Sequence, residues 1–162
     1  MSEFEMSDLG LLTFYLRIEV AQEEGQITLK QSAYAKKVLT QFGIAECNAT
    51  KVPMEPNPYI HKDLDGELMD PIEYRRVVGC LRYLLRTRPD LSYSLGIASR
   101  FMERPTTMHQ KAVKQILRYL KGTIQHGLIY QKDGVGEIII GYSDSDMAGD
   151  PDTRKSTVSS KS

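Results

Sequence analysis

Residues 70–122 read DPIEYRRVVGCLRYLLRTRPDLSYSLGIASRFMERPTTMHQKAVKQILRYLKG, and they hold most of the helical periodicity in the chain. Between Glu73 and Lys121 there are eleven Lys or Arg side chains against three Asp or Glu, a net charge of +8. The whole chain carries 21 residues of each sign and nets zero. The neutral total therefore conceals a basic helical block, and a one-signed block of this kind suits a polyanion as partner.

Proline, glycine and capping residues divide this block into three predicted helices. The first starts with Asp70 as its cap and ends before Pro89. The second covers roughly residues 91–102, and because it is almost entirely small or apolar, we expect it to be the most buried. The third is capped by one of the threonines at 106–107, with Gly122 as its terminator.

Seven basic side chains of the block are candidate phosphate contacts. Three share the outer face of the first helix, at i, i+7 and i+11, and four recur at intervals of three, four and three on the third helix. They are Arg75, Arg82, Arg86, Lys111, Lys114, Arg118 and Lys121. Cations spaced in this way can bind a nucleic-acid backbone without reading its sequence. The alternative interpretation is a solvated face, which many amphipathic helices have.

Upstream of the block, the pattern changes to strands and one helix. Residues 11–20 are rich in β-forming side chains, residues 26–30 alternate again, and Gly25 closes the loop between them, which predicts a β-hairpin. Ser32 is the predicted cap of a helix that ends at Phe42, with Gly43 just beyond it.

A proline-rich stretch and a terminal hairpin complete the prediction. Three prolines within six positions exclude regular helix from residues 46–69, so we expect a linker or a strap over the surface. Residues 127–131 and 137–142 are predicted to pair as a hairpin, and the polar tail is expected to fray. The predicted fold class is α+β, in four parts: hairpin plus helix (1–45), strap (46–69), basic helical block (70–123), and a terminal hairpin with its tail (124–162).

Several classes of protein are disfavoured by the sequence. No run approaches 18 apolar residues, and the acidic N-terminus lacks the apolar region of a secretory signal, so we expect an intracellular protein of the cytoplasm or nucleus. Cys47 and Cys80 have no metal-ligand spacing, and a reducing compartment is the default. His61, His109 and His126 are scattered and are interpreted as surface or helix-end residues. No glycine-rich phosphate loop or GxSxG motif occurs, and no cofactor is required.

Seven segments in register carry a family resemblance. They are FEMSDLGLLTFYLRIEV (4–20), QSAYAKKVLTQFGI (31–44), PMEPN (53–57), DPIEYRRVVGCLRYLLRTRPD (70–90), SRFMERPTTMH (99–109), KAVKQILRYLKGT (111–123) and GYSDSDMAGDPDTRKST (141–157). Together they resemble the C-terminal part of the reverse transcriptase of copia-type retrotransposons, running into the first strand of its RNase H domain. The resemblance implies that the basic block corresponds to the thumb and connection, which cradle the template–primer duplex.

The resemblance also implies where catalysis is expected. The polymerase carboxylates of the family are expected upstream of this chain, which has no YxDD pattern, and phosphoryl transfer needs metal ions held by several carboxylates. Asp144 resembles the first metal-binding aspartate of RNase H, with Asp146 two residues further on, so we expect at most weak Mg²⁺ binding there. The later RNase H carboxylates are not found in the chain. Arg17 stands where the family usually has a strand glycine, which argues against close primer contact, and Met147 replaces a tryptophan.

Two hypotheses about function follow. The first is a catalytically incomplete fragment of a copia-type Pol polyprotein that retains binding to RNA–DNA or another nucleic-acid duplex, with no membrane partner. The second is a small protein-interaction module co-opted from a retroelement, working through an exposed apolar strand. An active polymerase or nuclease is disfavoured by the missing carboxylates.

Overall fold

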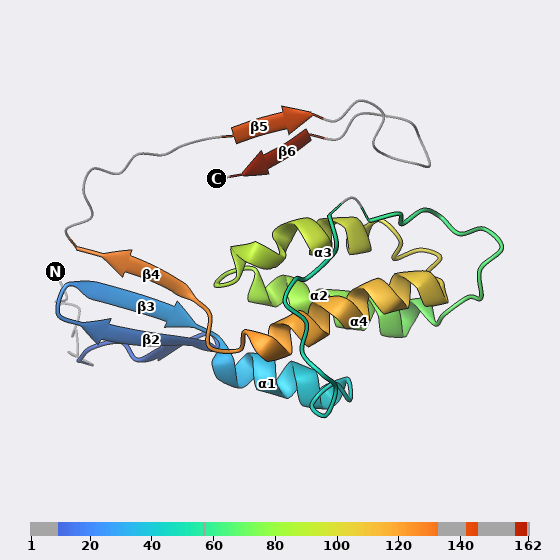
Figure 1. Cartoon of the computed structure of the whole chain (residues 1–162). Helices are drawn as coiled ribbons and strands as arrows, with labels where there is room; N and C mark the ends of the chain where they lie inside the picture. Colours follow the sequence, from blue (N-terminus) through green and yellow to red (C-terminus); the bar gives the residue numbers. More distant parts are fainter. Residues whose placement is uncertain (1–9, 57, 133–141, 146–157, 162) are drawn as a thin grey trace, which may run out of the picture.

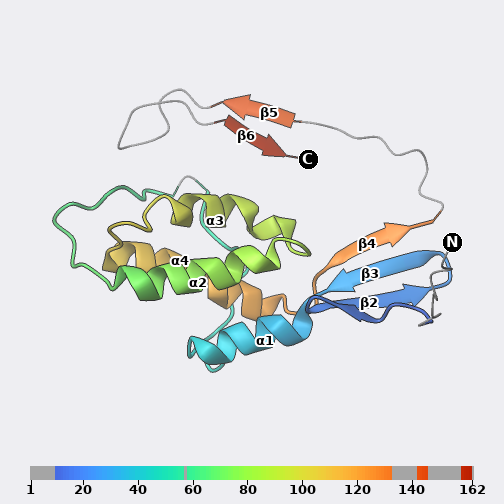
Figure 2. The ribbon, with the colours of Figure 1, turned by 180° about the vertical axis from the view of Figure 1, so that it is seen from behind.

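The computed structural model describes residues 10–56 and 58–132, together with the backbone of 142–145 and 158–161. Its α-helices are α1 (Ser32–Gln41), α2 (Pro71–Leu84), α3 (Ser92–Ser99) and α4 (Thr107–Gly122), with a 3₁₀ turn η1 (Pro89–Leu91). Its strands are β1 (Phe14–Tyr15), β2 (Ile18–Glu23), β3 (Gln26–Lys30), β4 (Leu128–Gln131), β5 (Tyr142–Ser145) and β6 (Val158–Lys161). The predicted α+β class is confirmed (Figures 1 and 2).

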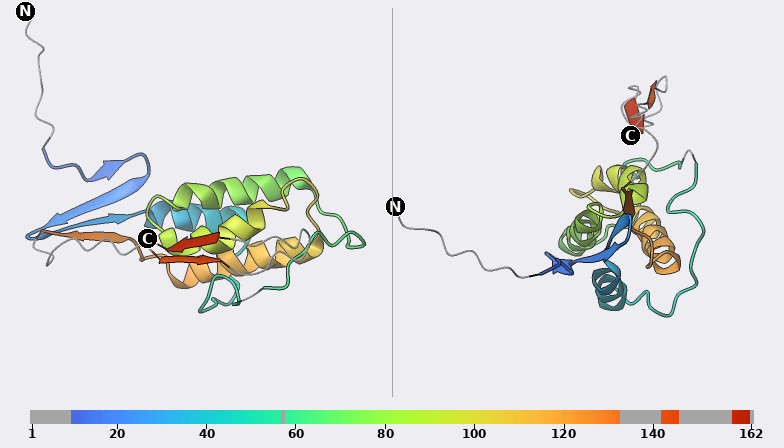
Figure 3. Two further views of the ribbon diagram at one scale, coloured as in Figure 1. Left: turned by 90° about the horizontal axis from the view of Figure 1, so that it is seen from above. Right: turned by 90° about the vertical axis from the view of Figure 1, so that its left-hand side faces the viewer.

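The four helices enclose one hydrophobic core. Figure 3 shows them end-on as four packed cylinders, with contacts running from α1 to α2, α2 to α3, α3 to α4 and α4 to α1. The buried apolar side chains recur at helical spacing on each: Ala35, Val38, Leu39, Tyr74, Val78, Leu81, Leu84, Leu95, Ala98, Val113, Ile116, Leu117 and Leu120. Helix α1, which the sequence analysis grouped with the hairpin, therefore joins the helices of the basic block. Each buried Val, Leu or Ile of this set contributes about 1.5–3 kcal/mol by leaving water.

The ends of α2 and α1 follow the predicted capping chemistry in part. Asp70 accepts a hydrogen bond from the Ile72 N–H at 2.8 Å, as a cap should. Gly43 has φ +66° and, with Ile44, sends its N–H back to the last turn of α1, so the predicted glycine stop is correct. The prediction for Ser32 was wrong, because Ser32 is the first helical residue and is buried. Instead the Glu19 carboxylate, from strand β2, accepts from the Ala33 N–H at 2.7 Å.

Helix α3 is shorter and more exposed than expected. It covers only Ser92–Ser99, and although Leu95 and Ala98 are buried, Tyr93 is 55% exposed. Apolar composition alone misled the prediction, since the side of the helix that carries Tyr93 and Gly96 faces away from the core. A helix at the edge of a bundle needs only one buried stripe.

The predicted first strand is interrupted by a turn. Leu16 and Arg17 have φ of +46° and +63°, and strands β1 and β2 pair across them, with Tyr15 opposite Ile18. Two consecutive left-handed residues make the tight hairpin turn that glycine and asparagine favour. Arg17 therefore lies in a turn and not on a strand, so the premise of the strand argument was wrong, and the expectation about primer contact stays a prediction.

Strand β4 belongs to the N-terminal sheet. The sheet is antiparallel in the order β1-β2-β3-β4, with Ile27 opposite Tyr130. The described partner of β4 is thus β3, about a hundred residues earlier, whereas the predicted partner 137–142 lies outside the described residues except for Tyr142. The expectation of a wholly frayed tail was wrong for seven of its residues, 143–145 and 158–161, since β5 and β6 form an antiparallel ladder. Backbone pairing of this kind needs no apolar side chains.

The predicted strap over residues 46–69 is irregular in structure and crosses helix α4 (Figure 1). Thr50 donates its N–H to the Arg118 carbonyl at 3.3 Å, and Met69 donates its N–H to the Pro105 carbonyl at 2.9 Å. Gly122 is the last residue of α4 and not a terminator beyond it. A Cβ at Gly122 would lie 3.1 Å from the Ala49 Cβ, so the glycine is what lets the strap approach.

Candidate nucleic-acid interface

Helix α2 presents the first group of predicted phosphate contacts. Arg75 and Arg82 are exposed, and neither side chain makes a hydrogen bond or ion pair within residues 10–56 and 58–132. Arg86 lies just beyond the helix end, also exposed, with its guanidinium carbon 4.9 Å from the centre of the Tyr83 ring. The spacing therefore places these arginines on a solvent-facing side of a rigid helix whose opposite side is core.

Helix α4 divides its four predicted contacts into two pairs. Lys111 and Lys114 are exposed. Arg118 and Lys121 are partly buried and donate to backbone carbonyls of the strap: Nε of Arg118 to Asn48 O at 2.6 Å, and Nζ of Lys121 to Cys47 O at 2.7 Å. The four cations do recur periodically in the sequence, but Arg118 and Lys121 hold the strap against α4.

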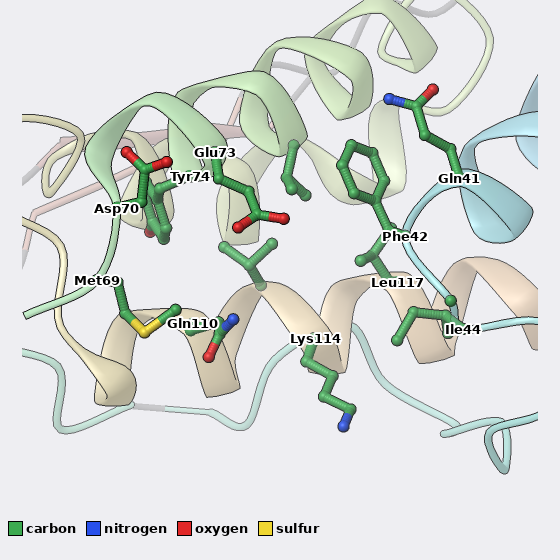
Figure 4. Close-up of a pocket in the computed structure, with 13 residues that line it drawn as sticks. Gln41, Phe42, Ile44, Met69, Asp70, Glu73, Tyr74, Gln110, Lys114 and Leu117 are labelled. Carbon is green, nitrogen blue, oxygen red and sulfur yellow. The ribbon is translucent and has the colours of Figure 1, made fainter.

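A groove of about 440 Å³ separates α2 from α4 beside the end of α1 (Figure 4). Its lining is both polar and apolar, with Phe42 and Leu117 among the apolar side chains. Asp70 and Glu73 lie on the α2 wall, and Lys114 lies on the α4 wall (Figure 4). The two carboxylates lower the positive potential on this side of the molecule. Arg75 and Arg82 do not line the groove, and Lys114 is the one basic residue among those that do.

Arg88 is a buried arginine that was not among the residues predicted from the sequence. Arg88 is 3% exposed and donates two hydrogen bonds to Asp90, of 2.9 and 2.7 Å, and two to Thr123, of 2.8 and 2.7 Å. The Tyr119 hydroxyl donates to the same carboxylate at 2.9 Å. Burial raises the pKa of the Asp90 carboxyl, but the hydrogen bonds and charge of Arg88 lower that pKa by more, so it lies below its ordinary value. The only available signal was an arginine directly before the proline that ends a helix.

His109 is a structural residue at the start of α4. The ring is fully buried, its Nδ1 accepts from the Thr106 N–H at 2.9 Å, and its Nε2 lies 2.8 Å from the His61 carbonyl oxygen. Phe101 stacks on it with ring centres 4.1 Å apart. The Thr106 hydroxyl also donates to Asp63 at 2.7 Å. The expectation of a surface or helix-end histidine was half right: the residue is at a helix end, and it anchors the strap from the inside.

The metal prediction lies mostly outside the described residues. Asp144 is in β5, with its backbone opposite Ser159, and Asp146 falls outside the described ranges. Within the described part of the chain, no group of three or more His, Cys, Asp or Glu side chains could hold a metal ion. In that same part, none of the helices is both long enough and apolar enough to cross a bilayer.

Comparisons with known proteins connect this geometry to a family. The profile of the reverse transcriptase (RNA-dependent DNA polymerase) family matches residues 1–56. The Pol polyproteins of transposons RE1 and RE2 of Arabidopsis thaliana are 40% and 39% identical to the chain, each over 95% of its length. The chain is similar to the copia-type Pol polyproteins. It spans about a tenth of the length of RE1 and RE2, 10% in each case.

The copia-type similarity also extends to a shorter protein. An uncharacterised mitochondrial protein of Arabidopsis thaliana is 36% identical over 96% of this chain, which covers 64% of that relative. No solved structure matches the chain. The family resemblance inferred from the seven segments is therefore confirmed, and the activity of this chain has to be argued from its own residues.

Proposed function

We propose that this segment of a retrotransposon-derived Pol protein binds a nucleic-acid duplex, an RNA–DNA hybrid in particular, through the exposed cations of α2 and α4. The observation that supports the proposal is the exposure of Arg75, Arg82, Lys111 and Lys114 on helices whose other faces are fixed in the core. Rigid helices hold the charges at constant spacing, so phosphate contact costs little ordering of the backbone. Such binding is sequence-tolerant and weakens with salt.

The test is a titration of the full chain against a labelled RNA–DNA hybrid at two salt concentrations. The decisive variant is Lys111→Glu with Lys114→Glu, because these two cations are exposed and do not hold the strap. A matched control is Lys36→Glu with Lys37→Glu on α1, which makes the same change in net charge. We expect the α4 variant to lose binding, and the salt slope to fall by about two units. Equal losses in both variants would show a net-charge effect only, and no binding at low salt would refute the proposal.

We also propose that the segment performs no catalytic step of its own and needs no cofactor. The support is that residues 1–162 contain no YxDD pattern, the paired aspartates expected of a copia-type polymerase. The chain is incubated with the hybrid and Mg²⁺, and neither primer extension nor RNA cleavage is expected. Cleavage that disappears in the Asp144→Asn variant would contradict this and would assign Asp144 a metal-binding role.

A second candidate function, a protein-interaction module, is favoured by the sheet. One face of the sheet carries Tyr15, Ile27 and Tyr130, which are 58%, 42% and 56% exposed. The sheet extends away from the helices (Figure 3), and these three side chains are left exposed by residues 10–56 and 58–132. An uncovered apolar sheet face is typical of a contact surface.

The first partner to test for this second function is another copy of the chain, by sedimentation over a concentration series. Self-association that is lost in the variant Ile27→Lys with Tyr130→Lys would support the interaction function. A chain that stays monomeric at all concentrations, and that binds the hybrid, would leave nucleic-acid binding as the function.

A further inference from the structure

The strap crosses α4 at the two cations that the sequence predicted as phosphate contacts. Arg118 and Lys121 each donate to a peptide carbonyl, of Asn48 and Cys47, at 2.6 and 2.7 Å. A carbonyl oxygen is a neutral acceptor, and a phosphate oxygen carries charge. Because charge-assisted bonds to an anion are stronger than bonds from the same donor to a neutral acceptor, phosphate is the better ligand for both side chains.

The other contacts of the crossing are few. Thr50 donates its N–H to the Arg118 carbonyl at 3.3 Å and its hydroxyl to the Gln115 carbonyl at 3.4 Å, both long for hydrogen bonds. Asn48 and Ala49 are exposed, and the apolar contribution of the crossing is the partly buried Cys47, which packs against the core. The two cations therefore provide the shortest contacts that keep this part of the strap in place.

The strap is held separately at its other end. The Asp63 carboxylate accepts from the Thr106 hydroxyl, and the His61 carbonyl lies 2.8 Å from Nε2 of the buried His109. The Thr107 N–H donates to the Glu67 carbonyl at 3.0 Å. These contacts are at the N-terminal end of α4, whereas the crossing is at the C-terminal end. The crossing can lift from Arg118 and Lys121 without loss of the anchor.

We propose that residues 47–50 form a displaceable cover that competes with nucleic-acid phosphate for Arg118 and Lys121. The inference rests on the proposed duplex binding and adds a regulatory step to it. With the cover in place, the segment binds through its exposed cations. With the cover displaced, two further cations reach the backbone, so affinity rises and the dependence on salt becomes steeper. Two added phosphate contacts steepen the salt slope by about two units and raise affinity at low salt by roughly tenfold or more.

A reversible lock tests the cover directly. The Ala49 Cβ and a Cβ built at Gly122 are 3.1 Å apart, near the separation of about 3.5–4.5 Å found in disulfides. The variant Ala49→Cys with Gly122→Cys, in a chain with Cys47→Ser and Cys80→Ser, ties the cover down when oxidised and releases it when reduced. The matched control is the same chain without the two new cysteines, measured with and without reductant.

The expected result is weaker hybrid binding and a shallower salt slope in the oxidised lock than in the reduced protein, with no effect of reductant on the control. Equal binding in both redox states would overturn the cover and leave the proposed function standing. Absence of binding in both states and in the control would overturn both.

A second pair of variants keeps the proposal testable if the lock fails to fold. Gly122→Val pushes against Ala49, while Gly96→Val, on α3, meets nothing within 4 Å. We expect tighter hybrid binding only for Gly122→Val. In the wild-type chain, saturating hybrid should speed alkylation of the partly buried Cys47 relative to Cys80, read by mass spectrometry. Equal binding by the two glycine variants, together with an unchanged alkylation ratio, would refute the proposal.

Discussion

Replacing Arg88 by alanine should destabilise the fold more than any other single charge removal in the basic block. The side chain is 3% exposed and makes four hydrogen bonds of 2.7–2.9 Å, to Asp90 and to Thr123. Removing one partner of a buried pair costs about 3–5 kcal/mol. The carboxylate is 36% exposed and regains water, so we take the lower end, about 3 kcal/mol. For a chain of this length the loss corresponds to a fall in Tm of roughly 6–12 °C.

The assay is urea unfolding followed by circular dichroism, with Arg75→Ala as the matched control. Arg75 is an exposed arginine of the same block, and its removal should change the free energy of unfolding by no more than about 0.5 kcal/mol. An Arg88→Ala variant that is as stable as Arg75→Ala would refute the argument that this arginine is buried and paired.

The same pair predicts an acid dependence of stability. The pKa of Asp90 is depressed in the folded protein, so its contribution is present above the unfolded pKa, near 4, and is lost as pH falls through the folded pKa. Unfolding measured from about pH 6 to pH 3 should show a steeper loss of stability in wild type than in Arg88→Ala. Parallel curves would mean that another carboxylate controls the acid limb.

Three further predictions concern other parts of the fold. His109→Ala removes a buried cap, a ring stack and a strap contact, and should lower the free energy of unfolding by about 2–3 kcal/mol, whereas the exposed His126→Ala should change it little in the same urea assay. Leu16→Asn with Arg17→Gly suits two positive φ angles and should stabilise by about 1 kcal/mol; an unchanged or lower urea midpoint would contradict this. Burial raises the pKa of Tyr34 to about 12, so stability should fall between about pH 10 and pH 12. An alkaline spectrophotometric titration should lose one late step in Tyr34→Phe and keep the step of Tyr74, whose pKa burial raises further.

The local signals in the sequence identified the helices well. Asp70 caps the N-terminus of α2, and Gly43, with a positive φ, follows the end of α1. The apolar residues of α2 and α4 are buried at the predicted spacing. These features depend on neighbours within about one helical turn, which a single sequence displays directly. The turn at Leu16 and Arg17 was missed because neither residue type favours positive φ, and only the pairing of β1 with β2 enforces it.

The sequence by itself determined where the positive charge lies, which residues form helices, and to which family the chain is related. Only the tertiary structure decided what each charge does. Arg118 meets Asn48 across 70 positions, and Lys121 meets Cys47 across 74. Periodicity places a side chain on a helix face but does not say which distant segment covers that face. A stripe that looks uniform along α4 is therefore two exposed cations and two that hold a strap, because the proline-rich segment returns across the helix.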